Sequence, residues 1–326
     1  MFLKRKARNI SGSFVDFGDF LKNTWSKSLV FLKEAAQKAK NLPETNMNLG
    51  LHHYYGGHFN DAAMRFVLLS WFRSSAARTN YNLGRCYYML GREGKAAKYL
   101  RKSLAAKDGL AESKYFLQKI DDPTSISSVP STLVAERFDF SDPKDEVFDE
   151  KSQNLLLNSI KPYFNNSPLS VLELGCGPGV LGKALRQYIA HCYLEGVDIS
   201  AGMVKRAGNL KIEGELVYNN LSQAEIGEFL QNRKIQYDII VSKGAFGYLG
   251  LSERILRLCH EALRPQGILV FFVSKAQGYL QFMPYRDKFS YSTAYLAKVA
   301  NAAQFSVLNI ADVSDKLMFC SFAAER

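Results

Sequence analysis

Three glycines follow an apolar run in the stretch Val-Leu-Glu-Leu-Gly-Cys-Gly-Pro-Gly at 171–179. Gly175, Gly177 and Gly179 let the backbone approach a ligand closely and adopt dihedral angles that other residues avoid. A second apolar run ends at Asp198, beyond the helical pattern that follows Gly179. An acid at the tip of a second strand is placed to accept hydrogen bonds from ribose hydroxyls. The spacing therefore predicts a site for a ligand that contains a nucleoside.

An acid inside the same stretch indicates which nucleoside is bound. A dinucleotide site expects Gly-x-Gly-x-x-Gly, with the pyrophosphate at the N-terminus of the following helix. Here the spacing is Gly-x-Gly-x-Gly, and Glu173 lies just before it. A carboxylate beside the loop repels a pyrophosphate and attracts a cation. S-adenosyl-L-methionine carries an ammonium and a sulfonium, so Glu173 favours this cofactor over NAD.

With these features, residues 167–323 resemble a class I S-adenosylmethionine-dependent methyltransferase. The run at 237–241 resembles the fourth strand of that family, and Leu-Arg-Pro-Gln-Gly at 263–267 resembles the turn into its fifth strand. The resemblance implies an α/β fold, a doubly wound, seven-stranded, Rossmann-like domain whose last strand is antiparallel to the others. The expected strands are 169–174, 192–197, 214–218, 237–242, 267–273, 305–311 and 316–323, with a helix near 291–303.

A repeated pattern precedes this domain. Gly50 matches Gly84, and Ala62 matches Ala96. Small residues at fixed points let paired helices approach closely, and a helix–turn–helix period of about 34 residues, as seen here, is typical of tetratricopeptide (TPR) repeats. Residues 41–120 therefore resemble two TPR repeats followed by a capping helix. A bacterial group of TPR repeat-containing methyltransferases joins such repeats to the same catalytic fold, and the chain resembles that group over residues 43–323.

The positive charge lies in the N-terminal third. Lys and Arg outnumber Asp and Glu by 13 over residues 1–120, whereas acids exceed bases by two in the remainder. Residues 1–40 are expected to form a basic amphipathic helix that either packs on the repeats or lies on an acidic membrane. A nucleic acid is a further partner that suits the basic region. We interpret residues 121–135 as a linker and 136–326 as the methyltransferase domain.

The resemblance also implies roles on the cofactor side. The three glycines are expected under the methionine end, with Glu173 at the ammonium group and Asp198 at the ribose. Ile199 either covers one face of the adenine or packs in the core. Asn220 stands where the family usually has an acid that accepts from the adenine amino group, and its amide oxygen can still accept that hydrogen bond.

The acceptor side is expected at 243–251 and in the tail segment 285–295. Lys243, Tyr248 and Tyr291 are the catalytic candidates there, with packing as the alternative role for each. Tyr291 replaces a histidine of the resembled group. An unperturbed phenol is a poor base at neutral pH, so we expect an acceptor that needs little help from a base.

The sequence thus predicts an S-adenosylmethionine-dependent methyltransferase with a TPR-like docking module, acting on a small molecule or a protein. Two alternatives stay open: a scaffold that holds the cofactor without catalysis, and an RNA methyltransferase. The five cysteines show no metal-binding spacing, so they are interpreted as reduced thiols and no metal is expected. No apolar run reaches the ~18 residues that span a bilayer. We expect a cytoplasmic protein, with peripheral membrane attachment as the alternative.

Overall fold

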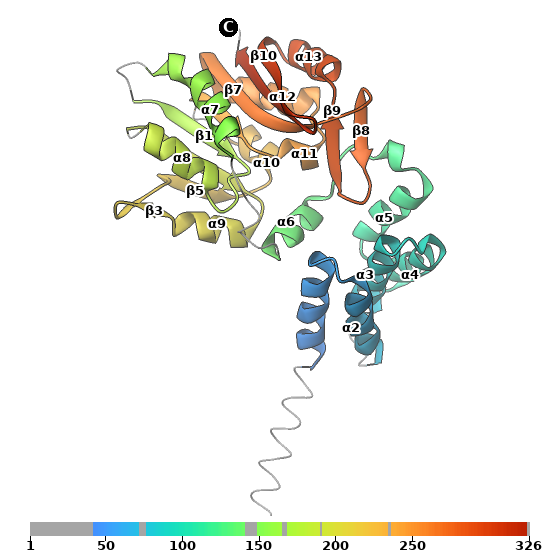
Figure 1. The fold of residues 1–326 in the computed structure, drawn as a ribbon. Helices are drawn as coiled ribbons and strands as arrows, with labels where there is room; N and C mark the ends of the chain where they lie inside the picture. The colour runs from blue at the N-terminus through green and yellow to red at the C-terminus, as the bar shows by residue number, and fades with distance from the viewer. Residues whose placement is uncertain are drawn as a thin grey trace, which may run out of the picture.

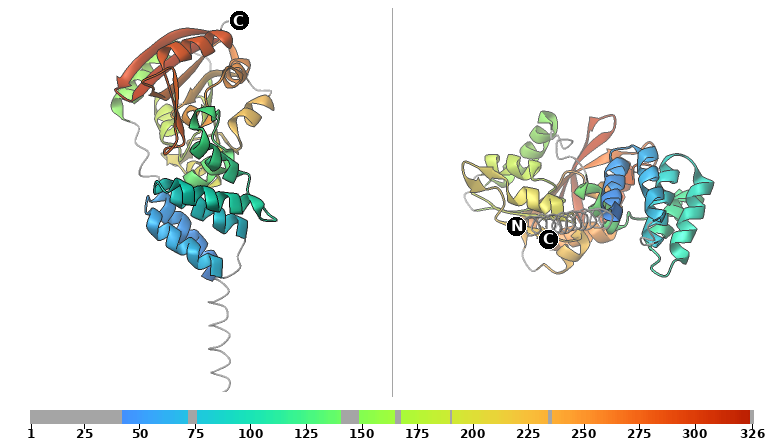
Figure 2. Two further views of the ribbon diagram at one scale, coloured as in Figure 1. Left: turned by 90° about the vertical axis from the view of Figure 1, so that its right-hand side faces the viewer. Right: turned by 90° about the horizontal axis from the view of Figure 1, so that it is seen from below.

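The computed structural model describes residues 42–71, 76–140, 149–164, 168–189, 191–233 and 236–324. The amphipathic helix expected at 1–40 lies outside the described residues. A group of helices forms the N-terminal part of the described chain, and an α/β sheet domain follows it (Figure 1; Figure 2).

The N-terminal part consists of helical hairpins. A helix over residues 42–55 is followed by α2 (Phe59–Trp71), α3 (Ala76–Met89), α4 (Glu93–Ala105) and α5 (Glu112–Asp121). A glycine with a positive φ makes the turn within each of the first two hairpins. A Cβ on Gly50 would lie 2.5 Å from the Phe66 ring, and a Cβ on Gly84 would lie 2.7 Å from the Leu100 side chain. Each hairpin therefore needs a glycine where its helices touch, and the two glycines are the pair that match in the sequence pattern.

The segment expected to be a linker is packed instead. It contains a short 3₁₀ helix, η1 (Pro123–Ser125), and the start of α6 (Ser131–Asp139). Ile126, Val129 and Leu133 are buried in the same apolar cluster as side chains of the sheet and of the N-terminal helices. The Pro- and Ser-rich composition reflects its turns, but the apolar residues between them fix the segment against the core. The prediction of a linker at 121–135 was wrong in this respect.

The prediction of a doubly wound α/β domain is confirmed by the main sheet. Its strands run in the order β10-β11-β7-β6-β1-β2-β5. The strands from β5 to β7 are parallel, and β11 is antiparallel to both β7 and β10. Their bounds are β1 (Ser170–Leu174), β2 (Tyr193–Asp198), β5 (Asn220–Gln223), β6 (Tyr237–Ser242), β7 (Leu263–Lys275), β10 (Phe305–Ser314) and β11 (Leu317–Ala324).

Helices cover both faces of this sheet because side chains alternate between the faces along each strand. Leu172 and Leu174 belong to the cluster that includes residues of α10, α12 and α13, whereas Val171 belongs to the cluster that includes residues of α7 and α8. The helices of the domain are α7 (Glu150–Ile160), α8 (Val180–Tyr188), α9 (Ala201–Gly208), α10 (Ile226–Gln231), α11 (Phe246–Leu249), α12 (Glu253–Ala262) and α13 (Thr293–Ala302).

The third strand is not where the sequence placed it. Residues near 214–218 form a separate hairpin of β3 (Lys211–Ile212) and β4 (Glu215–Leu216), which turns at Gly214 with φ +91°. The strand that joins the main sheet is β5, which begins at Asn220. The apolar run at 214–218 was mistaken for the sheet strand, and this error displaced the residue expected to follow it.

A second hairpin links the sheet to the N-terminal helices. It consists of β8 (Leu280–Met283) and β9 (Lys288–Tyr291), and β9 pairs with the end of β7. Figure 1 shows this hairpin extending from the sheet toward α5. At its turn, Asp287 accepts hydrogen bonds from Tyr115 Oη (2.7 Å) and Lys119 Nζ (2.6 Å) of α5. The N-terminal helices are therefore attached to the domain by a half-buried ion pair as well as by the shared core.

Candidate cofactor and acceptor site

The glycine turn after β1 has the geometry that the sequence predicted. Gly175, Gly177 and Gly179 all have positive φ, at 70°, 54° and 93°. A Cβ on Gly175 would also lie 2.7 Å from the Cβ of Ala245. A side chain at this position would thus strain the backbone and would also clash with the loop that follows β6. The chain can pass under a ligand here because it carries no side chain.

Asp198 is the last residue of β2 and lies beside the glycine turn. Its Oδ2 accepts a hydrogen bond from the Gly177 backbone N–H (2.9 Å), and its Oδ1 accepts one from the Ser200 N–H (2.9 Å). Burial raises the pKa of the Asp198 carboxyl, and the hydrogen bonds from Ser200 and Gly177 oppose that rise. These two bonds fix the carboxylate against the glycine turn, so it presents its remaining lone pairs in one orientation.

Glu173 is buried on β1 and receives a hydrogen bond from Tyr218 Oη at 2.7 Å. Burial, followed by the negative charge of Glu173, raises the pKa of Tyr218, so the phenol stays protonated and donates. A Cβ on Gly182 would overlap the Tyr218 hydroxyl, which explains a glycine inside α8. Sequence reasoning missed Tyr218 because its partner is 45 residues away.

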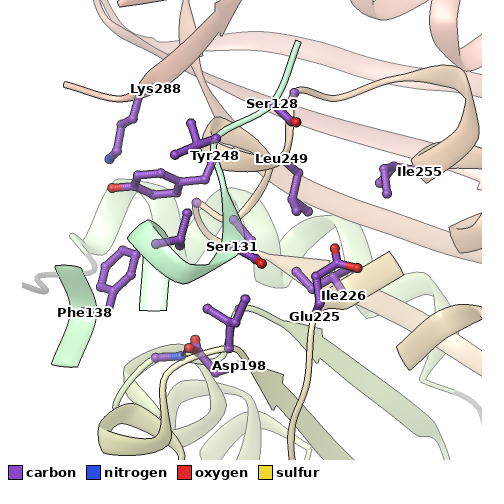
Figure 3. Close-up of a pocket in the computed structure, with 18 of the residues that line it drawn as sticks. Ser128, Ser131, Phe138, Asp198, Glu225, Ile226, Tyr248, Leu249, Ile255 and Lys288 are labelled. Atoms are coloured by element: carbon purple, nitrogen blue, oxygen red, sulfur yellow. Dashed lines mark hydrogen bonds between the residues drawn. The ribbon is translucent and has the colours of Figure 1, made fainter. Parts of the chain in front are cut away.

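A cavity of about 1050 Å³ lies above the ends of these strands. It brings together seven of the predicted residues on the cofactor and acceptor sides, which are Glu173, Gly175, Gly177, Asp198, Ile199, Lys243 and Tyr248. The cavity sits at the carboxyl ends of parallel strands, which is where open α/β sheets bind ligands. In Figure 3, Asp198 and Lys288 lie on opposite sides of it.

Tyr291, one of the three catalytic candidates, does not lie where the sequence analysis placed it. Its side chain is fully buried and is not among the residues that line the cavity. Its Oη donates to the Phe246 carbonyl (2.7 Å) and accepts from the Leu251 N–H (2.8 Å), and burial raises the pKa of the phenol. Tyr291 therefore links the two ends of the segment that carries Tyr248.

Asn220, which was expected at the adenine amino group, also lies elsewhere. It lies at the beginning of β5, where its Nδ2 donates to Glu195 Oε1 (2.7 Å), and it does not line the cavity. The first residue after this strand that lines the cavity is Glu225, whose carboxylate caps α10 by accepting from the N–H groups of Gly227 and Glu228 (both 3.1 Å). A Glu at a helix start was the available signal, and the misplaced strand concealed it. Gly179 also lies outside the lining, and it is the residue immediately before α8.

The sequence analysis assigned no role on the acceptor side to α6, whose first residues it interpreted as linker. Phe138 of α6 packs edge-on against Tyr248, with ring centroids 5.4 Å apart, and Lys288 Nζ lies 4.9 Å from the centre of the Tyr248 ring. Basic side chains also line the cavity, namely Arg137, Lys243, Arg254 and Lys288. The cavity thus has carboxylates at the ends of β1 and β2 and a lysine cation beside Tyr248.

Comparison with known proteins agrees with this geometry. Residues 172–269 match the family model described as a methyltransferase domain. The chain is 29% identical over 116 residues to a malonyl-(acyl-carrier protein) O-methyltransferase of Priestia megaterium, covering 36% of this chain and 40% of that protein. It is 33% identical over 107 residues to the enzyme of that name from Brevibacillus brevis, covering 32% and 38%. The chain therefore spans less than half the length of these relatives.

Solved structures are similar to part of the chain. The cyclase SpnF superposes with a TM-score of 0.50 at 14% identity, over 61% of this chain and 99% of that chain. The magnesium protoporphyrin IX methyltransferase ChlM from Synechocystis, with bound S-adenosylmethionine, has a TM-score of 0.45 at 13% identity, over 62% and 100%. The likeness to SpnF shows the fold alone.

These findings assign the chain a methyltransferase domain of the S-adenosylmethionine-dependent class, and S-adenosyl-L-methionine is the cofactor of that class. The described side chains suit it: acidic groups for an ammonium and a ribose, and glycines that permit close approach. Within the described ranges, no helix combines the length and hydrophobicity needed to cross a membrane.

Proposed function

We propose that this chain transfers the methyl group of S-adenosylmethionine to an anionic acceptor, carried on a small molecule or on a protein. The observation that carries the proposal is that acidic and basic side chains line different parts of the large cavity. Glu173 and Asp198 line it at the ends of β1 and β2, whereas Arg137 of α6 and Lys288 of β9 line it from outside these strands, with Lys288 on the side opposite Asp198 (Figure 3). Opposite charges attract strongly in such a partly enclosed space.

The acidic groups have complementary partners on the cofactor. Glu173 suits the ammonium group, Asp198 suits two ribose hydroxyls, and Glu225 is placed beyond β5 for the adenine amino group. The methyl group then points away from these strand ends, toward Tyr248. These assignments are inferred from the arrangement of the lining residues and from the chemistry of the cofactor.

Methyl transfer to a carboxylate asks little of the protein beyond alignment. The acceptor oxygen attacks the methyl carbon, the carbon–sulfur bond breaks, and the sulfur leaves as a neutral thioether. A carboxylate is already ionised at neutral pH, so no base must remove a proton. This agrees with a lining that, among the described residues, contains no histidine. Lys243 and Lys288 would hold the acceptor charge, and Tyr248 would position it while excluding water.

The malonyl-(acyl-carrier protein) O-methyltransferases that resemble the domain favour the same chemistry, since their name specifies an O-methylated acyl group attached to a carrier protein. We extend to this chain only the class of acceptor. The hairpins at 42–105 support a TPR-like docking module, because Gly50 and Gly84 match in the sequence pattern and make equivalent contacts between helices. Such a module would bind a protein that presents the acceptor.

A methyl-label assay tests the proposal. Extract of the source cell is fractionated into small molecules, proteins and RNA, and each fraction is incubated with the full chain and S-adenosylmethionine labelled in its methyl group. We expect label in the small-molecule or protein fraction that is released as methanol by mild alkali, as carboxyl methyl esters are. Label only in RNA, or alkali-stable label, would contradict the anionic acceptor. No label despite tight cofactor binding would indicate a scaffold that does not catalyse.

A further inference from the structure

A second cavity, of about 110 Å³, lies between the N-terminal helices and the sheet domain. Tyr54, Tyr55 and Arg85 contribute to its helical wall, and Tyr285 and Asp287 of the β8–β9 turn contribute to the opposite wall. Four residues line both this cavity and the larger one, which are Val129, Val134, Arg137 and Tyr248. The two cavities therefore adjoin beside Tyr248.

Arg85 is a buried cation in the wall of this second cavity. Only 1% of Arg85 is exposed. Its Nη1 donates to Glu136 Oε1 (2.7 Å) and to Tyr55 Oη (3.3 Å), and the guanidinium lies over the ring of Tyr54 at 4.3 Å. Its Nε and Nη2 are buried as well, and neither has a hydrogen-bond partner among the described residues. Most buried donors of a native protein are bonded, so this pair marks a place for a bound ligand or an ordered water.

The chemistry of that partner follows from the two nitrogens. An arginine stays protonated in a protein, and Nε and Nη2 form the edge of the guanidinium that can bind both oxygens of one carboxylate or phosphate. Each of the two acids nearby has one oxygen engaged by other donors or by Nη1. Asp287 accepts from Tyr115 and Lys119, while Glu136 occupies Nη1 of Arg85. The small volume suits a single compact oxyanion group.

We propose that the second cavity is an oxyanion subsite in which the Nε–Nη2 edge of Arg85 binds a carboxylate-type group. The adjoining cavities favour one source of this group, the distal end of the methyl acceptor, whose reactive end lies near Tyr248. On that arrangement the N-terminal helices select acceptors by the charge at their far end. This inference rests on the proposed function for its acceptor, whereas the anion site itself rests on Arg85.

Calorimetry on the full chain saturated with S-adenosylhomocysteine tests the subsite, with acetate and suberate as the probes. Suberate is a flexible dicarboxylic acid, so it can place one carboxylate in each cavity. We expect Arg85→Met and Arg85→Lys to weaken suberate binding roughly tenfold or more, because a charged bidentate pair is lost. The control is Arg257→Met on α12, an exposed arginine that lines neither cavity, which should bind suberate normally.

Glu136→Gln keeps Arg85 but removes the acid that competes for it, so it should tighten acid binding even if the Arg85 variants fail to fold. Suberate that binds tighter than acetate, and that weakens also in Lys288→Met, identifies the far end of the acceptor. Equal binding of both acids, lost only with Arg85, identifies a free anion in the same site. Two results would overturn the subsite alone. In one, the chain binds S-adenosylhomocysteine but neither acid. In the other, the acids bind equally well to the natural chain and to the Arg85 and Glu136 variants. If the natural chain does not bind S-adenosylhomocysteine at all, the proposed function itself is overturned.

Discussion

Asp198 offers a quantitative test of the cofactor site. Each of its carboxylate oxygens accepts one backbone N–H, from Gly177 and from Ser200, both at 2.9 Å. A carboxylate oxygen can accept a further hydrogen bond, so each retains the capacity to accept from one ribose hydroxyl. Asp198→Ala removes both acceptors and leaves the ribose donors unpaired in a buried site. The expected loss is about 2–3 kcal/mol, which corresponds to roughly 30- to 150-fold in the dissociation constant.

Calorimetric titration with S-adenosylhomocysteine measures this loss, and the thermal midpoint of each variant reports that it is folded. Asp312→Ala is the matched control, because Asp312 is exposed and pairs with Lys275 outside the cavity. Burial raises the pKa of Asp198, so acidification should protonate it earlier than an ordinary aspartate. Cofactor affinity should therefore fall with pH in the natural chain more than in Asp198→Ala. An unchanged affinity in a folded Asp198→Ala protein would refute the assignment.

Three further predictions concern the parts that position the cavity. Gly175→Ala should destabilise the fold by about 1–3 kcal/mol and weaken cofactor binding, because φ is +70° and the new Cβ meets Ala245. The control is Gly94→Ala, in open space within α4, which should stabilise the fold by ~0.5–1 kcal/mol. Chemical denaturation measures the free energy of unfolding of both variants. Tyr291→Phe should cost about 1–3 kcal/mol and lower the methyl-transfer rate while cofactor affinity stays unchanged; a rate equal to that of the natural chain would contradict a positioning role for Tyr291. Glu195 is buried and its pKa is lowered, since hydrogen bonds from Arg233, Tyr237 and Asn220 outweigh its burial. Its contribution is present above the unfolded pKa and lost as the pH falls through the folded value, so Glu195→Gln should destabilise at pH 7 and match the natural chain in acid; a pH-independent difference would argue against this cause.

The local parts of the site were predictable from the sequence. The glycine turn, Glu173 and Asp198 lie on two strands that are adjacent both in sequence and in the sheet, so their spacing alone places them together. The strands β6, β7, β10 and β11 coincide closely with the runs predicted for them, whereas the short strands β8 and β9 were not predicted. The strand expected at 214–218 failed because β5 is short and begins with polar Asn220, whereas the more apolar residues before it belong to a two-stranded hairpin and its exit.

The long-range parts could not be obtained from one sequence. Tyr218 bonds to Glu173 across 45 residues, and Tyr291 bonds to the Phe246 carbonyl across the same separation. The role of α6 depends on Val129 and Leu133, whose burial requires the sheet and the N-terminal helices to be in place first. For Tyr291, the position relative to the resembled family suggested chemistry, but only the packing shows that its hydroxyl is used by the backbone.

The orientation of the cofactor in the large cavity is the central claim, and a crystal structure of the full chain with S-adenosylhomocysteine tests it directly. We predict that the ribose hydroxyls bind Asp198, the ammonium group lies at Glu173, and the sulfur faces Tyr248 and Lys243 across the cavity. A cofactor bound elsewhere, or bound with its ribose away from Asp198 and its sulfur turned from the basic side, would contradict the account.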